Sequence, residues 1–289
     1  MCEFYTEKII EQVKEKVIDL YWLSIIEGDN KTTINLNPAN KTNNCYSVAK
    51  AFTVTALGLL YDEGKLHLDE KIVNIFKDEL PINFDPNWNN VTIDMVIRHK
   101  FGLAKGFLDI DEEDVNKFDK IYGSRTDYLN NVLSIDLPNR VNEKFVYSDG
   151  AYYLLARIIY KKTGKDISEY LREKLFNKLN FEEYAWSKCP FGYSMGATGL
   201  YLRSIDIAKL AKVYLDNGKY ENQLILSKEW CNIVINNYYE FYGKNGVYYK
   251  LGAYGQMIYF DKNKNLAIAC TGYSTRNNLN QVLEILKNI

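Results

Sequence analysis

The chain has very few of the residues that build metal sites. Only two of its 289 residues are histidines, His67 and His99, and its five cysteines are scattered without a C-x-x-C pair. Zinc and other transition metals are held in proteins by clusters of such side chains. We therefore expect no metal and no other cofactor, and we interpret the cysteines as reduced structural thiols.

Strong charge and long apolar runs are also missing. The chain has 36 basic and 37 acidic residues, a net charge of −1, which argues against a nucleic-acid or anionic-membrane partner. The longest apolar stretch, AFTVTALGLL, has about half the length of a membrane span. The N-terminal MCEFYTEKIIEQVKEK has no apolar core of the kind that a signal peptide needs. These features predict a cytoplasmic protein.

Strand-like patterns lie near both ends of the chain, and helical patterns fill the middle. The strand patterns cover 22–28, 32–38, 252–260 and 266–273, and the clearest helical ones cover 47–63, 151–164 and 204–218. This order predicts an α/β (α+β) fold, in which one antiparallel sheet from both termini is flanked by helices and carries an inserted all-helical subdomain.

We expect a single domain over residues 1–289. Residues 1–61 and 197–289 would form the α/β subdomain, and residues 62–196 the mostly helical one. A pocket is expected at the interface between the two.

The sequence S-V-A-K, which opens the helical pattern 47–63, contains the first candidate site. Lys50 is the only charged residue between Thr42 and Tyr61. Residues three apart share a helix face, so the amine of Lys50 would reach the hydroxyl of Ser47. Burial would lower the pKa of Lys50 and let it take the serine proton. The alternative is that Ser47 only caps the helix and Lys50 extends to the surface.

Two further segments carry candidate site residues. Tyr147, in FVYSDGAYYLL, lies just before a buried helix and could share the proton transfer. Alternatively, Tyr147 packs in the core while Ser148 or Asp149 caps the helix. In YYKLGAYGQMIYF, Lys250 could supply a second cation, and Gly252 could mark close approach by a ligand. The alternative there is a surface lysine beside a strand bulge.

Together and in this order, the three segments resemble the motifs S-x-x-K, Y-A/S-N and K-T-G of the serine β-lactamases and penicillin-binding proteins. The chain is most similar to the class C-like branch, with its related esterases and D-amino-acid peptidases. The similarity extends to GLLYDEGKLHLDEKI, to TIDMVIRHKFGL, to EKFVYSDGAYYLLARIIYKKTG and to GATGLYLRSIDIAKLAKVYLDNGKYENQLILSKEW, and covers roughly residues 40 to 273.

The resemblance implies a β-lactamase/transpeptidase-like fold and a role for each matched residue. Ser47 would be the acylated nucleophile, Lys50 its partner base, and Tyr147 the general base that activates water. Lys250 would supply positive charge, and the backbone N–H groups of Ser47 and Ala253 would form the oxyanion hole. Tyr254 follows this position as a further substrate-site residue. His99 matches a turn that is structural in the family, and no Ser-His-Asp order supports a triad.

Two positions depart from the family motifs. Asp149 replaces an asparagine that would donate a hydrogen bond to a substrate amide, whereas an ionised aspartate only accepts. Its charge would also raise the pKa of Lys50. Leu251 replaces a threonine whose hydroxyl would help to bind a substrate carboxylate. Both departures argue against an efficient β-lactamase.

Three functions therefore stay open. The first is a serine hydrolase that acts through an acyl-enzyme on a small ester, amide or D-amino-acid peptide. The second is a β-lactamase or a D-Ala-D-Ala carboxypeptidase with penicillin-binding activity. The third is a catalytically idle family member that binds a ligand or partner.

Aromatic residues in the loops of the helical part are candidates for a substrate pocket wall, or else belong to the core. They are Phe107, Tyr122, Trp186 and Tyr193.

Overall fold

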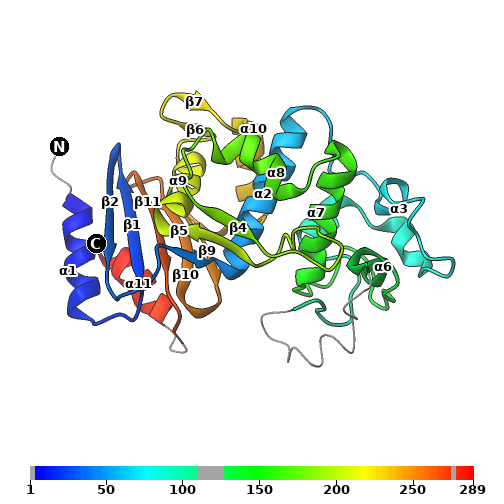
Figure 1. The fold of residues 1–289 in the computed structure, drawn as a ribbon, viewed down its shortest axis with the longest axis horizontal. Helices are drawn as coiled ribbons and strands as arrows, with labels where there is room; N and C mark the ends of the chain where they lie inside the picture. The colour runs from blue at the N-terminus through cyan, green and yellow to red at the C-terminus, as the bar shows by residue number, and fades with distance from the viewer. Residues whose placement is uncertain (1–3, 110–126, 275–277) are drawn as a thin grey trace.

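A six-stranded antiparallel sheet combines the two ends of the chain (Figure 1), as the sequence predicts. The computed structural model describes residues 4–109, 127–274 and 278–289. The strands follow the order β2-β1-β11-β10-β9-β8. Their bounds are Asn30–Asn35, Trp22–Glu27, Leu266–Thr271, Gln256–Asp261, Val247–Gly252 and Tyr242–Lys244.

Helices cover both faces of this sheet. The helices α1 (Phe4–Glu15) and α11 (Asn278–Asn288) pack on one face, and α9 (Ser204–Leu215) packs on the other. Every residue of β10 and β11 is buried, because these central strands are covered on both sides. The predicted α+β fold with a flanked antiparallel sheet is therefore confirmed.

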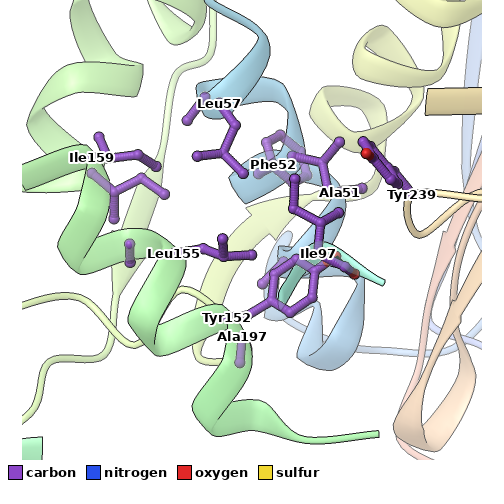
Figure 2. Close-up of a cluster of buried hydrophobic side chains, with 14 of the residues drawn as sticks. Ala51, Phe52, Leu57, Ile97, Tyr152, Leu155, Ile159, Ala197 and Tyr239 are labelled. Carbon is purple, nitrogen blue, oxygen red and sulfur yellow. Dashed lines mark hydrogen bonds between the residues drawn. The ribbon is translucent and has the colours of Figure 1, made fainter. Parts of the chain in front are cut away.

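The helix α2 (Ala49–Asp62) forms the centre of the molecule, and residues 49–60 are all buried. Figure 2 shows its side chains meeting those of α7 (Asp149–Thr163). At Gly58 a β-carbon would lie 2.2 Å from the indole of Trp230, so glycine lets α10 (Lys228–Asn236) pack closely against α2.

Smaller elements complete the chain. They are two minor sheets, β3-β5-β4 (Thr42–Asn44, Leu200–Arg203, Tyr184–Trp186) and β6-β7 (Lys219–Tyr220, Gln223–Leu224), and the short helices α3 (Ile72–Ile75), α4 (Ile93–Ile97), α6 (Tyr128–Leu133) and α8 (Ile167–Leu171). The helical subdomain boundaries at 62 and 196 stay a prediction.

Two local expectations need adjustment. The helix expected over residues 47–63 begins as a 3-10 turn over Tyr46–Val48 and continues as α2 from Ala49. The predicted strand 252–260 is split, because residues Ala253–Gly255 form a tight turn between β9 and β10.

The described cysteines are buried, and the described helices are short. Cys45, Cys189, Cys231 and Cys270 are buried and form no disulfide bond with one another, and Cys2 lies outside the described residues. Within the described ranges, every helix is too short or too polar to cross a bilayer.

Candidate active site

The 3-10 turn before α2 presents Ser47. Tyr46 has a φ of +45°, an uncommon conformation for a bulky residue, and its N–H donates to Asn44 Oδ1 at 2.9 Å. Val48 is buried, whereas Ser47 is partly exposed. The sharp turn therefore holds the Ser47 hydroxyl at the surface end of an otherwise buried helix.

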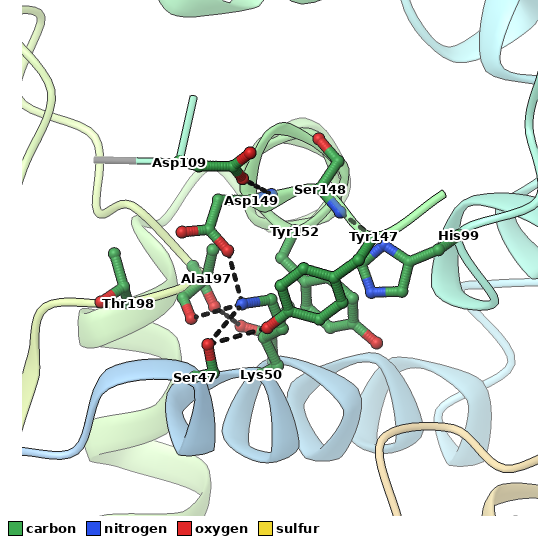
Figure 3. Close-up of polar contacts among 12 residues, drawn as sticks. Ser47, Lys50, His99, Asp109, Tyr147, Ser148, Asp149, Tyr152, Ala197 and Thr198 are labelled. Carbon is green, nitrogen blue, oxygen red and sulfur yellow. Dashed lines mark hydrogen bonds and ion pairs between the residues drawn. The ribbon is translucent and has the colours of Figure 1, made fainter. Parts of the chain in front are cut away.

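Two predicted partners meet at the Ser47 hydroxyl (Figure 3). Tyr147 OH donates to Ser47 Oγ at 2.7 Å, and Lys50 Nζ donates to the same oxygen at 3.2 Å. Lys50 comes from the first turn of α2, and Tyr147 from the segment just before α7. The structure thus brings together residues that lie 100 positions apart in the chain.

Lys50 is completely buried and does not extend to the surface. Its ammonium donates to Asp149 Oδ1 at 2.6 Å and to the carbonyl of Ala197 at 3.2 Å. Burial alone would lower the pKa of Lys50, but the Asp149 carboxylate, with Tyr147 and Glu240, raises it above its ordinary value. This is opposite to the lowering that a general-base role requires, and it agrees with the expected effect of Asp149.

Asp149 is the first residue of α7, but its carboxylate does not cap that helix. It points toward Lys50 (Figure 3), and the Asp149 backbone N–H donates instead to Asp109 Oδ1 at 2.9 Å. The Ser148 hydroxyl donates to the carbonyl of Phe107 at 3.1 Å. The alternative in which Asp149 or Ser148 caps α7 through its side chain is therefore wrong.

Lys250 has a buried partner that the sequence did not reveal. Its ammonium forms an ion pair with Glu240, whose side chain is 1% exposed, and the lysine side chain itself is 6% exposed. Burial alone would raise the pKa of Glu240, but Lys250, His99 and Lys50 lower it below its ordinary value. The alternative of a surface lysine is therefore wrong for Lys250.

His99 connects Glu240 to the backbone beside Tyr147. Its Nε2 lies 3.0 Å from Glu240 Oε1, and its Nδ1 accepts from the Ser148 N–H at 3.2 Å. Burial lowers the pKa of His99 below its ordinary value despite the nearby carboxylate. The contacts fit a neutral imidazole that carries its proton on Nε2. The structural interpretation of His99 agrees with this position.

Tyr147 lies between the two cations. The ammonium nitrogens of Lys50 and Lys250 are 4.6 and 5.2 Å from the centre of its ring, and the ring of His99 packs against it at 4.8 Å. The Tyr147 side chain is held by packing on one side while 36% of the residue stays exposed. Six residues around Ser47 form a connected group that we call the polar seam. They are Lys50 and Tyr147, which contact Ser47, and Asp149, Lys250, Glu240 and His99.

Gly252 lets strand β9 end directly against the nucleophile turn. A β-carbon at Gly252 would lie 2.8 Å from the carbonyl oxygen of Cys45 and 3.3 Å from the Val48 nitrogen. The close approach predicted at Gly252 is thus one of protein backbone. It brings the exposed Ala253, which follows Gly252, next to the turn that contains Ser47.

Tyr254 continues this edge of the site. It has a φ of +60°, and its ring contacts Tyr46 at 5.0 Å and stacks on Tyr273 at 4.7 Å between centroids. Leu251, by contrast, packs against the hydrophobic cluster between the sheet and the helices α1 and α11.

The aromatic residues of the helical loops are mostly core residues. Phe107 and Trp186 are 5% and 7% exposed, and Tyr193 packs on Arg157 with the guanidinium carbon 3.7 Å from the ring centre. Tyr122 lies outside the described residues. For Phe107 and Trp186, the core alternative is confirmed.

Glu240 is the main residue that sequence reasoning missed. It lies in NNYYEFYG, which matches none of the motifs, and its contacts are with His99 and Lys250, 141 and 10 residues away. The one available signal was a lone acidic residue among aromatic ones.

Comparison with known proteins identifies the family of this chain. The model of the Beta-lactamase family matches residues 29–283, which is most of the chain. The chain is also 29% identical over 142 residues to the N-acetylmuramyl-L-alanine amidase of Bacillus subtilis (strain 168), over 48% of this chain and 31% of the amidase. It spans less than a third of the length of the curated relatives it matches.

Solved structures share the whole fold. A Bacillus anthracis protein described provisionally as a 6-aminohexanoate-dimer hydrolase superposes with a TM-score of 0.78 at 17% identity, over 96% of this chain and 80% of that one. A penicillin-binding protein homologue from Caulobacter crescentus gives a TM-score of 0.76 at 11% identity, over 100% and 98%. The chain belongs to the beta-lactamase family.

Proposed function

We propose that this protein is a serine hydrolase that cleaves a small ester, an amide or a D-amino-acid peptide through an acyl-enzyme on Ser47. The observation that carries the proposal is the convergence of Tyr147 OH and Lys50 Nζ on Ser47 Oγ, at 2.7 and 3.2 Å. A serine hydroxyl becomes a useful nucleophile when a neighbouring group takes its proton.

Tyr147 is the group that we assign to proton transfer. Ser47 Oγ attacks the carbonyl carbon as its proton passes to the Tyr147 oxygen, and the tetrahedral oxyanion forms between the N–H groups of Ser47 and Ala253. As it takes the serine proton, the Tyr147 hydroxyl passes its own proton to the leaving oxygen or nitrogen. In the deacylation step, a water molecule attacks the acyl carbon and gives its proton to Tyr147. Tyr147 returns a proton to Ser47 Oγ as the carboxylic acid product leaves.

Lys50 then acts as a fixed cation. Because Asp149 lies 2.6 Å from its ammonium and both are buried, the pair keeps Lys50 protonated through the cycle. The ammonium stabilises the negative charge that develops on Ser47 and Tyr147, and its hydrogen bond orients the serine oxygen. This assignment replaces the partner-base role that the motif alone implies.

The names of the relatives support a substrate with a hydrolysable acyl group. One matched relative is called an amidase and one structural neighbour a dimer hydrolase. Asp149 offers no side-chain N–H to a substrate amide, and Leu251 offers no hydroxyl. Both features disfavour β-lactams and D-Ala-D-Ala termini relative to simple esters and amides.

The first test is covalent labelling of the folded protein with a fluorophosphonate. Intact mass followed by peptide mapping should find one adduct, on Ser47, and Ser47→Ala should remove both the adduct and the hydrolysis of activated esters. A parallel label on Ser187, a serine outside the site, would report non-specific reaction. A folded protein that gives no Ser47 adduct would instead support the idle, ligand-binding alternative.

A further inference from the structure

Both lysines of the site already have carboxylate partners. Lys50 pairs with Asp149, and Lys250 pairs with Glu240, so these four groups together carry no net charge. Among the described residues, these two pairs therefore supply no surplus positive charge that would attract an anionic substrate.

A substrate carboxylate could bind Lys250 only by displacing Glu240 from it. The two side chains of this ion pair are 6% and 1% exposed, so water and salt screen their attraction little. A substrate carboxylate that took over Lys250 would leave Glu240 buried without its cation, and an unpaired buried charge is costly. Glu240 is also held by His99 at 3.0 Å, which keeps it from turning away.

Two further residues of the site do not compensate for this loss. At position 251 a leucine packs under the sheet, where it contributes no donor. Asp149 is an acceptor only and would repel a carboxylate.

We propose, on the basis of the proposed function, that this site selects esters and amides that are uncharged around the scissile bond and discriminates against those with a carboxylate close to it. Glu240 is the residue that sets this preference, because it neutralises Lys250. The substrate class is thus an electroneutral acyl compound.

A matched pair of aryl esters tests the preference. The two share a phenylacetylglycyl acyl group and differ only in the leaving group, 3-hydroxybenzoate or 3-hydroxybenzamide. We expect kcat/KM of the wild-type enzyme to be at least about 10-fold higher for the benzamide ester, the range that one charge-assisted contact commands. Equal rates, or a preference for the benzoate ester, would overturn the proposal.

The variant Glu240→Gln tests whether Glu240 causes the preference for the uncharged ester. Glutamine keeps the shape and can still accept from His99, but it leaves Lys250 free to bind an anion. We expect the benzamide-to-benzoate ratio to fall about 10-fold, whereas Glu221→Gln, the same change in an exposed partner of Lys31, should leave it unchanged. An unaltered ratio in folded Glu240→Gln would contradict the role of Glu240.

Labelling and ester kinetics together separate the two proposals. If Ser47 takes no fluorophosphonate label and neither ester is cleaved, both the acyl-enzyme proposal and the selectivity proposal are overturned. If Ser47 is labelled and both esters are cleaved equally, only the selectivity proposal fails. Should Glu240→Gln not fold, the wild-type comparison alone still decides whether uncharged substrates are preferred.

Discussion

The polar seam and the layer under helices α1 and α11 are both buried, but they are built from different chemistry. The layer is a cluster of aliphatic and aromatic side chains, among them Ile25, Val282 and Ile285. The seam buries Lys50 and Glu240 at 0% and 1% exposure. Burying apolar groups stabilises a fold directly, whereas buried charges contribute only when they are paired. The contrast separates the part that holds the sheet together from the part that contains the candidate active site.

Removing one charge from the seam should have the largest effect. Lys50→Met leaves Asp149 buried without a cation, which should cost about 3–5 kcal/mol of unfolding free energy. It also removes the cation beside Ser47 Oγ, so kcat/KM should fall about 10²- to 10³-fold. Denaturant melts and ester kinetics measure the two effects.

The double variant Lys50→Met with Asp149→Leu serves as the control for that prediction. It should recover most of the lost stability, because no charge is left unpaired, but none of the activity. Recovery of activity would show that the cation is dispensable and would contradict its assigned role.

Tyr147→Phe should affect activity alone. The phenol OH is the proposed proton carrier, and its loss should lower kcat/KM about 10²- to 10⁴-fold. Because Tyr147 is 36% exposed and the phenyl ring stays in contact with His99, the melting curve should hardly move. A strong loss of stability would place Tyr147 among structural residues.

The opposite pattern is expected in the apolar layer. Ile285→Ala on α11 removes a fully buried side chain and should cost about 2–5 kcal/mol of unfolding free energy. At temperatures where the variant is folded, kcat/KM should equal that of the wild type. Reduced activity in the folded state would show that the two regions are coupled.

The smallest effect concerns pH and His99. Its pKa is lowered in the folded protein, so the unfolded chain binds a proton first as the pH falls. Stability from this group is therefore complete above its unfolded pKa of about 6.5 and declines below it, by up to about 1.4 kcal/mol per pH unit. Denaturant melts between pH 7.5 and 5.0 should show this slope, and His99→Gln should flatten it.

Sequence reasoning recovered the parts of the molecule that local patterns encode. Apolar strands at both ends predicted the sheet, and the three-residue spacing predicted the contact between Ser47 and Lys50, which is 3.2 Å in the structure. Tyr147 was a candidate from its place before a buried helix, but its pairing with Ser47 followed from the family resemblance, since no local rule connects residues 100 positions apart.

The sequence left the state of the buried charges open. Burial pointed to a lowered pKa for Lys50 and the charge of Asp149 to a raised one, and in the structure the carboxylate of Asp149 prevails. The partner of Lys250 depends on how the segment around Glu240 folds back beside β9, where Glu240 itself has a φ of +62°. Such pairings are set by tertiary packing, which periodicity and spacing do not encode.

The left-handed backbone of Tyr46 and Tyr254 has a consequence for how this site can evolve. The two residues flank the N–H groups of Ser47 and Ala253, and each holds a conformation that costs on the order of 1–3 kcal/mol. Their ring contact at 5.0 Å helps to hold both conformations in place. Glycine at either position would relax the backbone and remove that contact, so a more stable turn here would also be a looser one.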